Sequence, residues 1–174
     1  STNQLTQQII FGNDRKPPFV HTDLSEQFPG YKYENGKSTY RGEEVGEGGW
    51  VYAEPGYYTN VALLDVASMH PHSLIALKCF GEKYTARFQD IVKGRMAVKH
   101  HDVEAAKRYL GEDAGALIGQ NDAALAFALK IAINSVYGLT AAKFPTRANG
   151  MDPANNPDNI VAKRGALFMV DLKN

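Results

Sequence analysis

The sequence predicts an α/β fold, and three observations lead to that prediction. Gly and Pro punctuate residues 1–60, which is typical of short strands and turns. Residues 60–66 form a compact apolar run that includes one carboxylate, Asp65, and this pattern favours a buried strand that places Asp65 at its end. Two segments with helical periodicity follow, over residues 84–110 and 121–137.

Composition and charge limit the possible classes. The chain has 174 residues, of which 44% are hydrophobic and 22% charged, as expected for a globular domain. Nineteen basic and nineteen acidic residues cancel, so the net charge does not point to a nucleic-acid partner. Residues 76–110 carry eight Lys or Arg against four Asp or Glu, which fits a local anionic ligand or a solvated helix face. The one cysteine excludes an internal disulfide, and no apolar run approaches the roughly 20 residues of a membrane span. Because no targeting pattern is present, the cytoplasm is the expected compartment.

The two periodic segments predict a helical hairpin. The first has a single apolar stripe, formed by Phe88, Ile91, Val92, Met96, Val103, Tyr109 and Leu110. Gly111 marks its end, and Asn121 or Asp122 is a suitable N-cap for the second helix. Since the connection is short, we expect the two helices to pack antiparallel.

The remaining segments predict a turn, a loop and a last helix. Pro71 disfavours helix at His70, so a turn is expected there. Residues 141–159 are rich in Pro and Asn and predict a loop. Asp158 or Asn159 could cap a final helix that runs through Val170.

Cations on the two hairpin helices indicate an anion-binding cleft. Arg95 and Lys99 lie four residues apart, in the middle of the apolar stripe of the first helix. Because unpaired cations in a buried face are costly, either both side chains extend past its edge or the face lines a cleft that holds an anion. Lys130, Asn134 and Tyr137 share one face of the second helix. If the hairpin closes, the three cations converge on one phosphate-rich group, since Lys and Arg both bind phosphate.

Asp65 is the candidate metal ligand. A lone Asp at a strand end is usually a turn former or a cap. Next to a cluster of cations sized for a triphosphate, its expected role is a hard-oxygen ligand for Mg²⁺.

Four segments resemble family B DNA polymerases, over roughly residues 40–174. Residues 65–73 resemble the first palm motif, D-x-x-S-L-Y-P-S, and residues 130–138 match the fingers motif K-x-x-x-N-S-x-Y-G at every fixed position. Arg95 and Lys99 resemble the R-x-x-x-K pair of the first fingers helix. Residues 48–56 resemble the G-G-x-V…P…G segment between the exonuclease and polymerase regions.

The resemblance implies a fold, a reaction and a set of site residues. The fold would have palm strands, an antiparallel helical fingers hairpin and a returning palm helix. Asp65 would bind two Mg²⁺ ions and the backbone carbonyl of Val66 one of them. The incoming deoxynucleoside triphosphate would contact Ser68, Met69, His70, Arg95, Lys99, Lys130 and Asn134. The primer–template DNA would lie against Gly48, Gly49, Tyr137 and Gly138.

The chain departs from the family pattern at several positions. His70 replaces the tyrosine that usually excludes the ribose 2′-hydroxyl, His72 replaces a serine and Gly46 an aromatic. No D-T-D element is present, and Asp171 lies in a helical sequence that does not resemble it. Nothing resembles the acidic motifs of the proofreading exonuclease. We therefore expect a phage-type polymerase fragment that is inactive without the rest of its chain.

The expected organisation follows the motifs along the chain. The segments are a strand-and-turn lead at 1–60, a palm strand with the first catalytic motif at 61–80, the fingers at 81–140, and a loop with the palm helix at 141–174.

Two other readings remain open. One is a non-catalytic nucleic-acid-binding module, which would use the basic hairpin and the aromatic segment at residues 31–41. The other is a metal hydrolase whose Zn²⁺ ligands would be His70, His72, His100 and His101. Pro71 disrupts strand geometry between the first two imidazoles, and adjacent histidines on a helix diverge, so the second reading is the weaker one.

Overall fold

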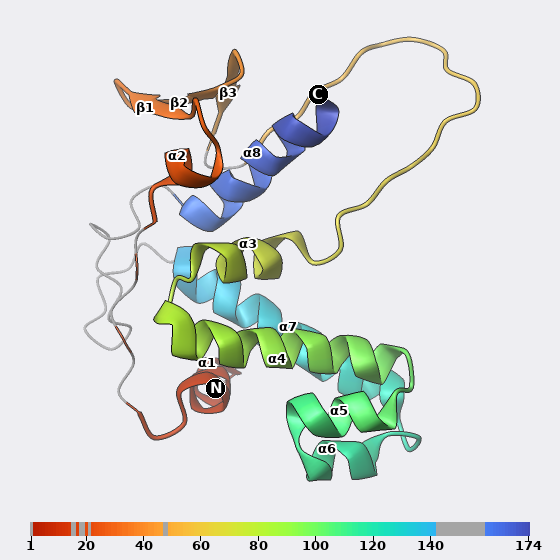
Figure 1. Cartoon of the computed structure of the whole chain (residues 1–174). Coiled ribbons are helices and arrows are strands. Elements are labelled where there is room, and N and C mark those ends of the chain that lie inside the picture. The colour runs from red at the N-terminus through yellow and green to blue at the C-terminus, as the bar shows by residue number, and fades with distance from the viewer. Residues whose placement is uncertain (1, 15–16, 18–19, 21, 47–48, 142–158) are drawn as a thin grey trace.

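The computed structural model describes residues 2–14, 17, 20, 22–46, 49–141 and 159–174 (Figure 1). Within these residues the fold is mixed, with eight helices and one three-stranded antiparallel sheet, so the general α/β prediction is confirmed. The helices are α1 (Thr2–Phe11), α2 (Leu24–Gln27), α3 (Met69–Leu77), α4 (Gly81–Lys99), α5 (Val103–Leu110), α6 (Glu112–Leu117), α7 (Asp122–Ala141) and α8 (Ile160–Lys173). The strands are β1 (Lys32–Glu34), β2 (Lys37–Tyr40) and β3 (Glu43–Val45). None of the described helices is both long enough and apolar enough to cross a bilayer.

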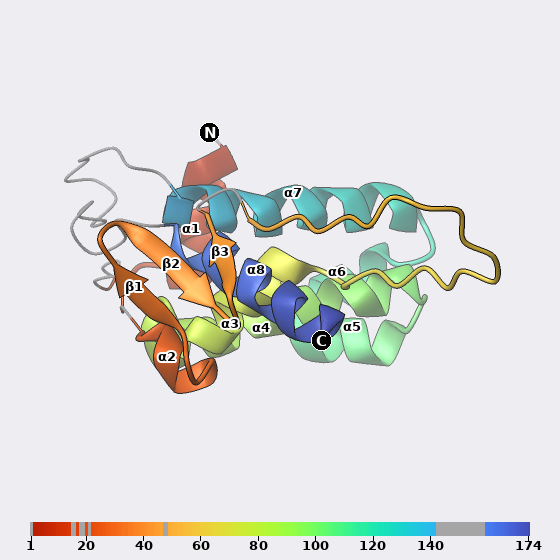
Figure 2. The ribbon, with the colours of Figure 1, turned by 90° about the horizontal axis from the view of Figure 1, so that it is seen from above.

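The body of the molecule is built on α4 and α7, which lie side by side and antiparallel (Figures 1 and 2). The predicted antiparallel arrangement is therefore confirmed, although α5 and α6 lie between the two long helices in the chain. The apolar faces of α1, α3, α4, α7 and α8 meet in one core that includes Ile10, Leu74, Phe88, Val136 and Leu167, all nearly inaccessible to solvent. This core fixes how α3 and α8 are placed against the long pair.

The first helical segment is broken where one helix was expected. The continuous helix over 84–110 is wrong, because α4 ends at Lys99 and α5 begins at Val103. Asp102 caps α5 by accepting a hydrogen bond from the backbone N–H of Ala105 at 3.0 Å. Gly94 lets α5 fold back against α4, since a Cβ atom there would lie 2.3 Å from Cγ of Leu110.

The cap of the second long helix is confirmed, because Oδ1 of Asn121 accepts the N–H of Ala124 at 3.1 Å at the start of α7. The last helix also lies where it was expected, with Asn159 at its N-cap position. Asp158 and most of the expected loop lie outside the described residues. Residues 1–60 were expected to lack helices, and α1 and α2 show that this was wrong.

The expected strand at residues 60–66 is also wrong. This segment is extended but pairs with no strand among the described residues, and it belongs to an exposed arc that leaves the helical body (Figures 1 and 2). Leu63 is 94% exposed and Leu64 78%, so their side chains have no apolar surface against which to pack. The turn expected at His70 is a helix start instead. Pro71 lies in the first turn of α3, where its missing N–H is not needed.

The small sheet lies beside α2 and α8 (Figure 1). Its strands follow the order β1-β2-β3, joined by tight turns at Asn35-Gly36 and Arg41-Gly42 in which all four residues have positive φ. The sheet is fastened to α8 through Asp171, which accepts the hydroxyl of Tyr40 at 2.7 Å and Nε of Arg41 at 3.0 Å. Asp171 is therefore a helix residue with a structural role, in agreement with the helical sequence around it.

Candidate functional site

An open groove of about 440 Å³ runs between α4 and α7. We call it the cation groove, because its lining includes Arg95 and Lys99 from α4 and Lys130 from α7. The rest of the lining is formed by Val98, His101, Asp122, Ala123, Ala126 and Phe127. The three cations that the sequence placed on facing helices thus share one surface.

Arg95 is the most firmly held of the three cations. It is half-buried, and its Nε donates to the backbone carbonyl of Ala126 at 3.3 Å. Lys99 and Lys130 are exposed, so their amines are reachable from solvent. A partly desolvated guanidinium that shares a groove with two exposed amines suits a multiply charged anion such as a polyphosphate.

Among the described residues that line the cation groove, Asp122 supplies the carboxylate. The sequence suggested Asp122 only as a helix cap. Its Oδ1 accepts the N–H of Gly119 at 2.6 Å, and its Oδ2 pairs with Nδ1 of His101. The Gly119 hydrogen bond and the contact with His101 lower the pKa of the Asp122 carboxyl, against a smaller opposing effect of burial. Since Asp122 is ionised and faces three cations, the lining keeps an excess of positive charge.

His70 and Tyr137 bring the two best-matched motifs into contact. Their rings stack with centroids 4.2 Å apart and planes inclined by 5°, and this contact joins α3 to α7. The Tyr137 hydroxyl accepts a hydrogen bond from Nδ2 of Asn159 at 3.3 Å. Burial lowers the pKa of His70, so the ring stacks as the neutral imidazole.

The residues that resemble the fingers motif occupy one side of α7. Lys130, Asn134 and Tyr137 follow each other at spacings of four and three residues, which places them on one helix face. Asn134 and Gly138 are exposed, and a Cβ added to Gly138 would meet no atom within 4 Å. This face therefore leads from the cation groove to the aromatic stack.

A second groove, of about 340 Å³, lies between the start of α3 and α8. We call it the α3–α8 groove, and its lining is Val66, Ala67, Met69, His72, Ser73, Arg164 and Phe168. Ser68 lies in the chain between the lining residues Ala67 and Met69, and its φ of 52° is left-handed, a conformation that non-glycine residues adopt at a cost. Met69 packs against Gly165, where an added Cβ would lie 2.7 Å from the sulfur. Sequence reasoning selected Val66, Ser68 and Met69 here but missed Arg164.

Asp65 directly precedes Val66, a lining residue of the α3–α8 groove, in the chain, and it is exposed to solvent. Within the described ranges, no three His, Cys, Asp or Glu side chains gather as a metal site. Mg²⁺ requires roughly six oxygen ligands and is commonly held by one or two carboxylates together with substrate phosphates, so Asp65 and the carbonyl of Val66 could supply two ligands of one ion.

The remaining expected residues are more dispersed. Gly49 donates its N–H to the carbonyl of Gly46 at 3.2 Å, whereas Gly48 lies outside the described residues. Among the proposed zinc ligands, His70 stacks on Tyr137, His72 turns Nδ1 to the carbonyls of Ala67 and Ser68, and His101 pairs with Asp122. These imidazoles therefore serve three different local structures.

No protein-family model, curated protein or solved structure matches this chain.

Proposed function

We propose that this chain is the palm-and-fingers part of a family B DNA polymerase. The reaction is nucleotidyl transfer from a deoxynucleoside triphosphate to the end of a primer on a DNA template. The cation groove carries the proposal, because Arg95, Lys99 and Lys130 come from two helices and line one open surface. In this proposal α4–α7 are the fingers, and α3 and α8 are palm helices.

The geometry of α7 suits a nucleoside triphosphate. Lys130 and Tyr137 are seven residues apart, which corresponds to about 10.5 Å along a helix. That span is comparable with the length of the ligand. The phosphates would lie at the cations, and the base and sugar would lie near the stack of His70 on Tyr137.

The residues present suit the chemistry of phosphoryl transfer. The terminal hydroxyl oxygen of the primer attacks the α-phosphorus, a new P–O bond forms, and the bond to the leaving pyrophosphate breaks. Negative charge grows on the leaving group, and Arg95, Lys99 and Lys130 would stabilise it while holding the phosphates in position. Asp65 and the carbonyl of Val66 would hold Mg²⁺, which supplies further charge neutralisation at the phosphates when bound.

Lys130→Ala tests the proposal directly. The variant should weaken deoxynucleoside triphosphate binding to the chain by about 2–3 kcal/mol, or roughly 30- to 150-fold, because it removes a charge-assisted contact. Titration calorimetry of wild type and variant gives the two affinities. Lys37→Ala is the matched control, since Lys37 forms only an exposed ion pair with Glu44 on the small sheet and should leave the affinity unchanged.

The same titrations separate polymerase from nucleic-acid-binding module. A chain that binds primer–template DNA but ignores free deoxynucleotides would be the module. Equal affinities for the nucleotide in Lys130→Ala and wild type would contradict the proposed role of the cation groove.

A further inference from the structure

Arg164 of α8 lines the α3–α8 groove, and its partners among the described residues are neutral. Its Nε donates to Oε1 of Gln27 at 2.8 Å, and its Nη1 lies 3.5 Å from Oγ of Ser73. Its guanidinium carbon lies 5.6 Å from the centre of the Phe28 ring. No carboxylate in the described part of the chain forms an ion pair with it, and burial lowers its pKa. Arg164 is therefore a partly desolvated cation that lacks a counter-charge among these residues.

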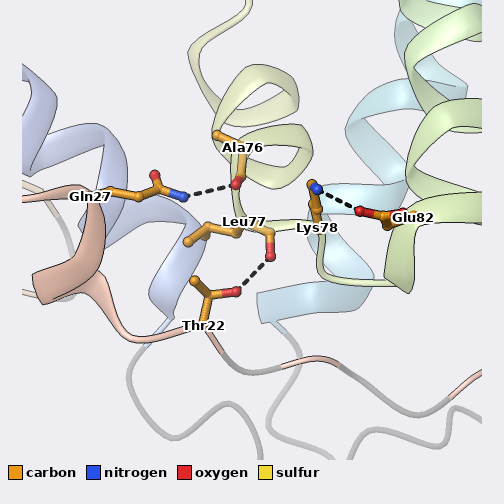
Figure 3. A network of polar contacts seen from close by, with 6 residues as sticks. All are labelled: Thr22, Gln27, Ala76, Leu77, Lys78 and Glu82. Atoms are coloured by element: carbon orange, nitrogen blue, oxygen red, sulfur yellow. Dashed lines mark hydrogen bonds and ion pairs between the residues drawn. The ribbon is translucent and has the colours of Figure 1, made fainter.

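The position of Arg164 is fixed by a network at the end of α3. Gln27, which accepts from Arg164, also donates through Nε2 to the carbonyl of Ala76 at 2.8 Å (Figure 3). Thr22 donates its hydroxyl to the carbonyl of Leu77 at 2.8 Å (Figure 3). These bonds satisfy carbonyls at a helix end that have no partner within the helix. The guanidinium is thus held in place before any ligand arrives, which lowers the entropic cost of binding.

The surroundings of Arg164 suit an oxyanion. Ser73 places a hydroxyl beside the guanidinium, while Val66 from the loop before α3 and Met69 from the start of α3 also line the groove. The described residues of the groove lining include no Asp or Glu. An arginine fork with a hydroxyl beside it is a common arrangement for binding a phosphate group.

We propose that Arg164 binds a phosphate group in the α3–α8 groove, next to residues 66–69. The choice of phosphate over carboxylate rests on the proposed function, whereas the unpaired charge and its rigid support do not. The phosphate belongs either to the backbone of a DNA strand or to a free nucleotide. Both sources present the same oxygens to the guanidinium, and the experiment below tells them apart.

The test compares Arg164→Gln and Arg164→Lys with the wild-type chain in two binding titrations. One uses a fluorescein-labelled primer–template duplex and the other a deoxynucleoside triphosphate. Arg164→Gln should weaken one of these by at least about tenfold. A loss of affinity for the duplex alone identifies a strand phosphate. In that case the slope of log affinity against log salt concentration should also be smaller by about 1. A loss confined to the triphosphate identifies the free nucleotide. Arg164→Lys should lose less affinity than Arg164→Gln, because it keeps the positive charge but not the forked guanidinium.

Arg108→Gln is the matched control, because Arg108 is exposed on α5 and lines neither groove. If Arg164→Gln does not fold, protection of wild-type Arg164 from phenylglyoxal, read by mass spectrometry, decides instead. Duplex or triphosphate should protect Arg164 and leave Arg108 reactive. Unchanged affinities in Arg164→Gln, or equal modification of Arg164 with and without ligand, overturn this inference. The Lys130→Ala result stands apart from it, since Lys130 lies in the other groove.

Discussion

The imidazole of His70 lies parallel to the phenol of Tyr137, with ring centroids 4.2 Å apart. His70 lies at the start of α3 and Tyr137 near the end of α7, in the two segments that resemble the palm and fingers motifs. Among the described residues the buried Nδ1 atom of His70 has no hydrogen-bond partner, whereas its ring stacks on Tyr137. Protonation would place a charge in this contact and require an N–H donor at Nδ1, which has no acceptor among the described residues.

The stack should make stability depend on pH in the acidic range. Because burial lowers the folded pKa of His70 below its usual 6.5, the unfolded chain binds more protons just below that pH. The contribution of His70 is therefore complete above pH 6.5 and declines as the pH falls through the window below it. His70→Phe keeps an aromatic ring that does not titrate, so it should flatten this part of the curve. Melting temperatures of both proteins between pH 7.5 and about pH 5 measure the effect, and parallel curves would contradict it.

Under the proposed function His70 should also influence sugar selection, because it occupies the position at which the palm motif that this segment resembles has a tyrosine. Shortening it to Ala should raise the affinity for ribonucleoside triphosphates relative to deoxynucleoside triphosphates. Competition binding on the chain gives this ratio for wild type and variant. His100→Ala is the control, since His100 is exposed at the end of α4. An unchanged ratio in His70→Ala would assign the gate to another residue.

The sequence predicted the two long helices α4 and α7 and the faces that they share. The apolar stripe on α4 and the Asn121 cap of α7 arise from local spacing and local hydrogen bonds, which are visible in the chain itself. Because residue spacing determines which side chains share a helix face, the sequence alone assigned Arg95, Lys99 and Lys130 to one groove. The break at Asp102 was missed although its cap is local, because the apolar stripe continues across it.

Long-range contacts explain most of what was missed. A strand needs a partner, and the apolar run at 60–66 finds none among the described residues, so its periodicity gave the wrong structure. Arg164 lies far from every other groove residue in sequence except Phe168, and its role depends on Gln27 and Ser73 from distant helices. No local pattern could have identified it as part of a site.

Asp171 should contribute to stability rather than to metal binding. Tyr40 is almost fully buried, and its hydroxyl donates to Asp171. This hydrogen bond, together with burial, raises the pKa of Tyr40. Asp171→Ala leaves that hydroxyl without an acceptor, so it should lower the free energy of unfolding by about 1–3 kcal/mol. Asp171→Asn keeps an acceptor oxygen and should cost less.

Urea denaturation of these variants, with and without Tyr40→Phe, measures the coupling between the two residues. In a Tyr40→Phe background the cost of Asp171→Ala should shrink, because no hydroxyl is left unsatisfied. Equal costs in both backgrounds would show that Asp171 acts mainly through Arg41.

The chain alone should not extend a primer. Asp65 is exposed and adjoins a groove whose lining contains no other carboxylate, and Asp171 is engaged by Tyr40 and Arg41. Each Mg²⁺ ion requires roughly six oxygen ligands and gives up its waters reluctantly, so one carboxylate and one carbonyl are too few for two ions. Primer extension by the purified chain, with Mg²⁺ and with the more permissive Mn²⁺, should therefore be absent in both. Extension that Asp65→Ala abolishes would show that a second carboxylate of this chain completes the site, and the interpretation of Asp171 would then need to change.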